Sequence, residues 1–123
     1  LFIMDKNGDN IKRISKGRGV YGNPVWSPRG DFIAFTKLTQ GNFHIGVMDT
    51  NGNNERVIVR DFSLESPAWS PNGRYLIFHR QKRSNLDGTG GEVSIHFIDI
   101  TGYNERVIPT PLDGSDPAWS PLL

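Results

Sequence analysis

The chain has 123 residues, of which 14 are lysine or arginine and 13 are aspartate or glutamate, so its formal net charge is +1. This length suits one small domain, and the near-neutral charge argues against a dedicated nucleic-acid binder and against a protein held on membranes by a basic surface. The lack of cysteine excludes a disulfide scaffold, a cysteine zinc site and a cysteine nucleophile.

The chain begins with a short apolar block that ends at Asp5 and is followed by a polar turn at Asn7-Gly8. Asn-Gly between strand-like runs is typical of a two-residue type I′ hairpin turn. The block returns twice, so that it occupies residues 3–14, 47–58 and 97–108. Such recurrence indicates a repeat protein rather than an isolated hairpin.

A second block contains Trp-Ser-Pro and also occurs three times, at 23–30, at 66–73 and, cut short, at 116–121. Its tryptophans are 43 and 50 residues apart, and the aspartates of the first block are 44 and 50 residues apart. The extra residues of the longer interval therefore fit the polar, glycine-rich run at 80–92. A period in the forties is typical of four-stranded propeller blades or of paired helices.

Local patterns favour strands over helices. Short runs of aromatic and β-branched residues occupy 32–36 and 75–79, and no helix-length window carries an apolar stripe with a 3.6-residue period. We predict strands at 24–27, 31–37, 43–49 and 55–59, and again at 67–70, 74–80, 93–99 and 105–108. The predicted fold class is all-β, a β-propeller fragment with about three four-stranded antiparallel blades. Its repeats would span 1–22 as a partial unit, 23–65, 66–115, and 116–123 as a closing strand.

The tryptophan of each unit has two structural interpretations. It could pack between neighbouring blades and tie them together, or it could fill the core of its own blade. The pattern does not choose between them, and neither interpretation makes the tryptophan a ligand site.

The residues that could carry chemistry do not form a catalytic pattern. There is no G-x-S-x-G sequence, and His44, His79 and His96 share no repeat position. Aspartates 5, 49 and 99 recur in every unit, so we expect them to accept backbone N–H bonds in Asx-type turns. We therefore expect no catalytic residue, no cofactor and no metal site in this chain, while a metal held by several blades in the channel of a complete propeller stays open.

The two blocks resemble the TolB family of six-bladed β-propellers, most specifically over Tyr21–Lys37, Phe43–Met48 and the ending Asp116–Leu123. The resemblance covers the whole chain as the C-terminal half of the propeller. It implies a non-enzymatic periplasmic protein of the Tol–Pal cell-envelope system that supports outer-membrane integrity and cell division. It also implies that the propeller binds the lipoprotein Pal, and that TolA contacts a separate N-terminal region that this chain does not contain.

Other interpretations give the same repeats a different role. The propeller of a prolyl-oligopeptidase-like or tricorn-like serine peptidase has similar repeats and would gate substrate access. A carbohydrate- or small-molecule-binding propeller is disfavoured, because no repeated polar and aromatic sugar site is present. Neither nucleic acid nor membrane insertion is expected. Since a propeller needs about four to eight blades, we expect this chain to be about half of one, with open sheet edges through which it could self-associate.

Partner contacts are expected on the connections that run from the last strand of one blade to the first strand of the next. These connections occupy 15–23, 60–66 and 110–116, and loops on a rigid scaffold commonly carry function. The segment at 61–67 resembles the corresponding loop of the TolB family, although Ser63 and Ser66 depart from its usual residues. The predicted partner-binding residues are Tyr21, Asn23, Phe62, Leu64, Glu65, Ser66, Ser115 and Asp116.

Overall fold

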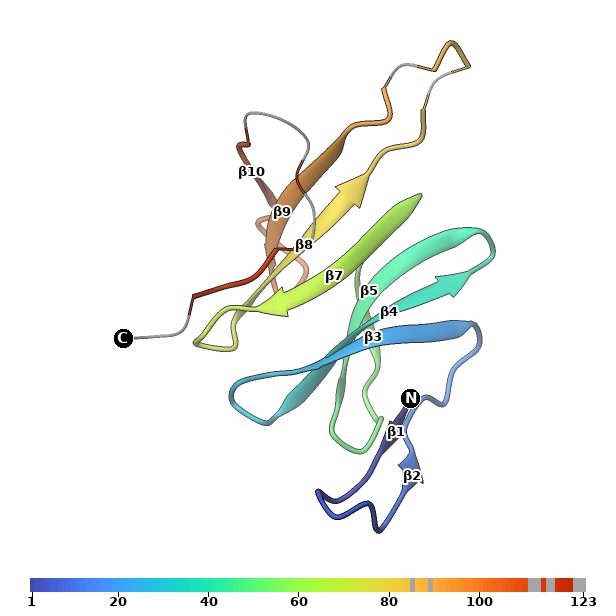
Figure 1. Ribbon diagram of the computed structural model, residues 1–123, viewed down its shortest axis with the longest axis vertical. Coiled ribbons are helices and arrows are strands. Elements are labelled where there is room, and N and C mark those ends of the chain that lie inside the picture. The colour runs from blue at the N-terminus through green and yellow to red at the C-terminus, as the bar shows by residue number, and fades with distance from the viewer. Residues whose placement is uncertain (85, 89, 111–113, 115–116, 121–123) are drawn as a thin grey trace.

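A computed structural model describes residues 1–84, 86–88, 90–110, 114 and 117–120 of the chain. Every regular element in this described part is a β-strand (Figure 1). The strands are β1 (Phe2–Ile3), β2 (Lys12–Arg13), β3 (Val20–Trp26), β4 (Phe32–Thr39), β5 (Asn42–Asp49), β6 (Arg56–Asp61), β7 (Ser63–Trp69), β8 (Tyr75–Gln81), β9 (Val93–Asp99) and β10 (Arg106–Ile108).

The strands form three antiparallel sheets. The first contains only β1 and β2, the second has the order β3-β4-β5-β6, and the third has the order β7-β8-β9-β10. We call the second sheet blade 1 and the third sheet blade 2. Strand β7 of blade 2 packs against blade 1, where it contacts β3, β4 and β5, and β8, β9 and β10 continue blade 2 from it (Figure 1). The all-β propeller-fragment architecture predicted from the repeats is confirmed.

The first strand of each blade starts earlier than predicted. β3 and β7 begin at Val20 and Ser63, whereas strands were expected from 24 and 67. Both strands cross a β-bulge where Asn23 (φ 47°) and Ser66 (φ 54°) adopt left-handed backbone conformations immediately before a proline. A bulge is a place where proline's missing N–H does not break the ladder, so the pairing continues on both sides of it. Phe62 alone therefore separates β6 from β7.

The predicted closing strand at 116–123 is described only at residues 117–120, and these four residues are not in a strand.

Most of the core lies between the two blades. One continuous cluster joins buried side chains of blade 1 to buried side chains of blade 2: Ala34, Ile45, Val47 and Val59 with Leu64, Trp69, Leu76, Phe78 and Ile98. A second cluster, centred on Ile33 and Phe35, packs blade 1 against Ile14 and the β1–β2 sheet. Each blade therefore buries its faces on its neighbours, as a propeller requires.

Trp69 settles how the repeated tryptophan is used at this junction. Its side chain is 7% exposed, and its indole Nε1–H donates a hydrogen bond of 2.9 Å to the carbonyl oxygen of Val25 on β3. Trp69 thus packs between the blades and links their innermost strands. Trp26 and Trp119 hold the same place in their repeats but are 51% and 40% exposed.

The recurrent aspartate turns differ from the predicted hairpin type. Only Gly52 of the Asn51-Gly52 pair has a positive φ, and its N–H donates to the Asp49 carbonyl oxygen at 3.0 Å. A type I′ turn needs positive φ at both residues, so that prediction was wrong. The Asp49 carboxylate accepts the N–H groups of Asn51 and Asn53, both at 2.9 Å. These bonds favour an Asx-type turn, which confirms the role predicted for Asp49. The prediction was wrong for Asp5, whose carboxylate accepts a side-chain bond of 2.5 Å from Asn10 Nδ2 instead of a backbone N–H.

Replacing Gly52 by alanine is expected to destabilise the protein by about 1–3 kcal/mol, because alanine disfavours a φ of 80° and because its Cβ would lie 2.0 Å from the Ile14 carbonyl oxygen. The matched control is Gly8→Ala, where φ is 85° but no atom lies within 4 Å of the added Cβ. Urea unfolding compares the two variants. Equal losses at both positions would show that the contact with Ile14 is unimportant.

Candidate interaction surface

The blades have two different ends, because antiparallel strands return alternately to each. One end contains the β4–β5 hairpin, Phe62 and the loop between β8 and β9, and we call it the hairpin end. The other contains the turns between β3 and β4, β5 and β6, β7 and β8, and β9 and β10, and we call it the turn end (Figure 1). The connection from blade 1 to blade 2 lies at the hairpin end, so the contact residues predicted on this connection belong to that end.

Tyr21 lies on β3 and belongs to a polar cluster inside blade 1. Its hydroxyl donates to the Glu55 carboxylate, which also accepts a bond of 2.8 Å from Lys37 Nζ. The Lys37 ammonium lies 4.8 Å from the centre of the Tyr21 ring. Burial, followed by the bond to Glu55, raises the pKa of Tyr21 above its usual 10.0. The phenol therefore stays protonated, and its hydroxyl is occupied by the hydrogen bond to Glu55 within the blade instead of being available to a partner.

Leu64 was predicted as an apolar contact for a partner, and this prediction needs correction. Its side chain is completely buried in the cluster between the blades. The reason is that β7 starts at Ser63, so Leu64 occupies a core-facing position of a strand instead of a loop. Leu64 supports the surface from beneath and does not belong to it.

Four predicted residues remain at or near the surface. Asn23 is exposed and Ser66 half-buried, and the two lie at equivalent bulges of the neighbouring innermost strands. Glu65 keeps 47% of its side chain exposed, with a carboxylate oxygen 3.8 Å from His79 Nε2. The Phe62 side chain is 36% exposed between the blades. Ser115 and Asp116 lie outside the described residues.

Next to Phe62 stands a charged cluster that the sequence interpretation missed. Arg80 on β8 places Nη1 2.9 Å from the Asp61 carboxylate of blade 1 and Nη2 2.9 Å from the Glu105 carboxylate of blade 2. The second Glu105 oxygen lies 2.8 Å from Nδ1 of His96. The sequence could have indicated the pair of Arg80 and Glu105, because these residues occupy the repeat positions of Lys37 and Glu55 in blade 1 and conserve their opposite charges.

His96 is the buried histidine of this cluster, and its ring stacks on Phe78 with the centroids 5.7 Å apart. Burial lowers the pKa of His96 below 6.5, and Arg80 adds to this effect while Glu105 opposes it. A histidine with a lowered pKa takes up a proton more readily in the unfolded chain than in the folded one. Its neutral form therefore contributes stability above pH 6.5 that is lost as the pH falls.

We expect the free energy of unfolding to decrease when the pH falls from neutral through 6.5 and below, and we expect His96→Gln to reduce this dependence. Urea unfolding of both proteins over a pH series measures it. A wild-type protein that becomes more stable on acidification over this range, or a variant with an unchanged pH dependence, would contradict this role for His96.

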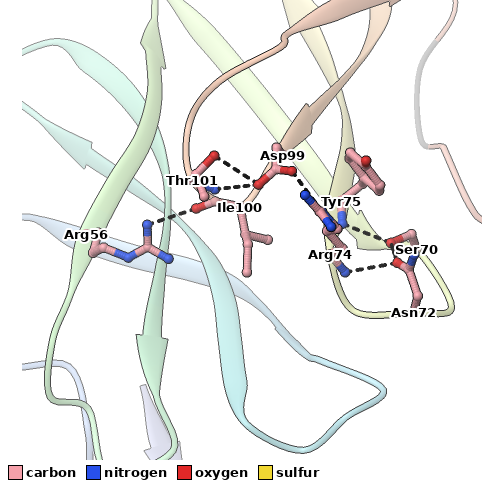
Figure 2. A network of polar contacts seen from close by, with 8 residues as sticks. All are labelled: Arg56, Ser70, Asn72, Arg74, Tyr75, Asp99, Ile100 and Thr101. Carbon is pink, nitrogen blue, oxygen red and sulfur yellow. Dashed lines mark hydrogen bonds and ion pairs between the residues drawn. The ribbon is translucent and has the colours of Figure 1, made fainter.

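At the turn end, the polar side chains serve the fold (Figure 2). The Asp99 carboxylate accepts the N–H and the hydroxyl of Thr101 at 3.0 and 2.9 Å, and pairs with Arg74 Nε at 3.2 Å. Bonds from Thr101, followed by the Arg74 contact, lower the pKa of Asp99. Arg56 of blade 1 donates to the Ile100 carbonyl oxygen of blade 2 at 2.9 Å, so this network also joins the blades. These groups are occupied by structural contacts.

The turn end also contains an apolar cleft of about 460 Å³. Its walls come from the repeated Trp-Ser-Pro segments, and they comprise Val25, Trp26, Pro28, Trp69, Pro71, Trp119 and Ser120. Indole and proline rings dominate it, and its described lining residues include no ionisable side chain. These residues therefore offer shape and apolar contact, with the Ser120 hydroxyl as the one polar side chain among them.

Among the described residues, no group of three or more histidine, aspartate or glutamate side chains could hold a metal ion. In the same part of the chain, no helix has the length and apolar character needed to cross a membrane.

The chain is similar to curated proteins named Tol-Pal system protein TolB. Over 76 residues the chain is 50% identical to the Tol-Pal system protein TolB of Gluconobacter oxydans, which covers 62% of this chain and 17% of that protein. Over 68 residues it is 47% identical to the Tol-Pal system protein TolB of Wolbachia pipientis wMel, covering 54% and 16%. The chain therefore spans about a sixth of the length of these relatives.

Solved structures show the same fold. A putative TolB from Agrobacterium tumefaciens superimposes with a TM-score of 0.76 at 23% identity, covering 98% of this chain and 46% of that one. TolB from Acinetobacter baumannii gives a TM-score of 0.72 at 21% identity, covering 90% and 26%. The family described as the TolB beta propeller domain matches residues 1–123. With two blades packed through Trp69 and this match along its whole length, the chain belongs to the TolB β-propeller family.

Proposed function

We propose that the chain acts as part of a non-enzymatic scaffold of the Tol–Pal system that binds the lipoprotein Pal. The observation that carries this proposal is the match of the entire chain to the TolB propeller family, together with relatives named as Tol-Pal system proteins. The proposal includes a periplasmic location and a role in outer-membrane integrity and cell division, which membership of the TolB family supports. TolA would contact a region outside this chain. The relatives compared are all named TolB, so no peptidase role is proposed.

The hairpin end is the surface that we propose for Pal. Its two blades are fixed to each other by a shared apolar core and by the bond from Trp69 to Val25, so loops at this end start from a rigid base. The proposed contact residues are Asn23, Phe62, Glu65 and Ser66, with Ser115 and Asp116 kept as further candidates. Tyr21 and Leu64 support this surface from within the blades.

We expect the complete natural protein to bind a soluble Pal domain in an isothermal titration, and Glu65→Lys to weaken the binding by about tenfold, which corresponds to one reversed contact. Asp31→Lys is the matched control, because Asp31 is a partly exposed acid at the turn end, 3.7 Å from Arg29. Its affinity should equal that of the wild type. A wild-type protein that does not bind Pal would refute the proposed function, and equal affinity of Glu65→Lys would remove Glu65 from the surface.

A further inference from the structure

We propose that Phe62 and Arg83 form one pre-oriented contact for an acidic protein segment, and that Asp61 and Arg80 are positioning residues that hold it in place. This inference rests on the proposed function, since it names the chemistry by which the partner would be recognised at the hairpin end.

Phe62 and Arg83 come together from two different parts of the chain. Phe62 joins the blades, and Arg83 follows β8 in the long loop that leads to β9. The guanidinium carbon of Arg83 lies 4.5 Å from the centre of the Phe62 ring. An arginine held against an aromatic ring keeps its N–H groups available for a carboxylate, with which it can form two parallel hydrogen bonds.

Two cationic residues stand together beside this pair, while the neighbouring Asp61 carboxylate is already paired with Arg80. Arg83 follows Lys82, and among the ion pairs found in the described part of the chain none involves either residue. A partner that places a carboxylate against Arg83 and an apolar side chain against Phe62 would satisfy both groups at once. Aromatic and arginine side chains are also the residues most often found at the energetic centre of protein interfaces.

The backbone at Phe62 is held from both blades. The Phe62 N–H donates to the Asp61 carboxylate at 2.6 Å, and the other oxygen of that carboxylate lies 2.9 Å from Arg80 Nη1. Arg80 is in turn anchored on Glu105 at 2.9 Å, and only 17% of its side chain is exposed. Because Arg80 pairs with carboxylates of both blades, it holds the Asp61 side chain and, through it, the backbone N–H of Phe62. This fixes the orientation of Phe62 at the junction of the blades.

We call the contacts of Arg80 with Asp61 and Glu105 the clamp. Comparison with blade 1 shows that the clamp is not needed to build a blade. There Lys37 and Glu55 form the equivalent ion pair, and the Tyr21 hydroxyl supplies the third group from within the same blade. In blade 2 the position of Tyr21 is occupied by Leu64, and Arg80 reaches back to Asp61 instead. The planar fork of arginine can bind two carboxylates in this way, whereas lysine acts as a point charge. The clamp is therefore an addition specific to the junction that displays Phe62.

The test uses the complete natural protein, with the soluble Pal domain as titrant at low and high salt. We expect Phe62→Ala to weaken binding by about tenfold, as an aromatic contact at an interface centre does. Arg83→Gln should weaken it several-fold and reduce the dependence of affinity on salt, because a charge contact is screened by salt. The matched control is Arg29→Gln, which removes an exposed arginine at the turn end and should bind as the wild type does.

Arg80→Lys tests the positioning role, with hydrogen exchange of the Phe62 amide as a readout that does not depend on the partner. We expect faster exchange at this amide together with weaker binding, while urea unfolding reports whether the variant stays folded. Wild-type binding combined with unchanged affinities of Phe62→Ala and Arg83→Gln would overturn this inference and leave the proposed function standing. Absence of wild-type binding would overturn the proposed function, and this inference with it.

Discussion

Replacing Trp69 by alanine is expected to lower the free energy of unfolding by about 3–5 kcal/mol, the range for removing a large buried aromatic side chain. Trp69 is 7% exposed and packs among residues of both blades, so the substitution opens a cavity at the junction. It also removes the hydrogen bond to the Val25 carbonyl oxygen. Natural domains are stable by only about 5–15 kcal/mol, so a loss of this size is a large fraction of the total. Urea unfolding followed by circular dichroism measures it.

Two further variants separate the contributions. Trp26→Ala removes a tryptophan from the same repeat position, but this side chain is 51% exposed, so the loss should be clearly smaller. Trp69→Phe keeps most of the apolar contact and deletes the indole N–H, so it should cost less than Trp69→Ala. Equal losses for Trp69→Ala and Trp26→Ala would contradict the role of Trp69 as the link between the blades.

Leu64→Ala is expected to destabilise the protein by about 2–5 kcal/mol, because Leu64 is fully buried beside the second blade's own core residues. Affinity for Pal, measured under conditions in which the variant is folded, should stay close to the wild-type value. Thermal unfolding and isothermal titration on the same preparation measure the two quantities.

Phe62→Ala provides the opposite pattern at a position two residues away. Its side chain is 36% exposed, so we expect a loss of stability of less than about 1 kcal/mol and a clear loss of affinity. If Leu64→Ala left stability unchanged and weakened binding, Leu64 would be a contact residue after all. The assignment of Leu64 to the core would then be wrong.

Much of the fold could be predicted because the same sequence blocks recur and form the same local structure in each blade. The short runs around Phe35 and Phe78 are rich in aromatic and β-branched side chains, and both become central strands of four-stranded sheets. The aspartates at 49 and 99 were predicted to accept backbone N–H bonds, and both do so. Recurrence supported these predictions, although the first copy differs, since Asp5 accepts the Asn10 side-chain amide instead of a backbone N–H.

The rest depended on contacts between segments that the pattern treats separately. Residues before Pro24 and Pro67 read as loops, because a proline normally marks a strand's edge or start. The left-handed conformations of Asn23 and Ser66 create bulges, so both strands begin earlier than predicted. Because β7 therefore includes Leu64, this side chain lies in the core and not in a loop. The ion pair between Arg80 and Asp61 joins different blades, so no single repeat reveals it.

The central claim is that this protein binds a partner through the hairpin end of rigidly joined blades. Hydrogen exchange of the complete natural protein, with and without a saturating soluble Pal domain, tests it most directly. We expect binding to slow exchange in peptides that contain Phe62, Glu65 and the loop after β8, and to leave the Asp49 and Asp99 turns at the other end unchanged. Slower exchange at those turns, with no change around Phe62, would contradict the claim.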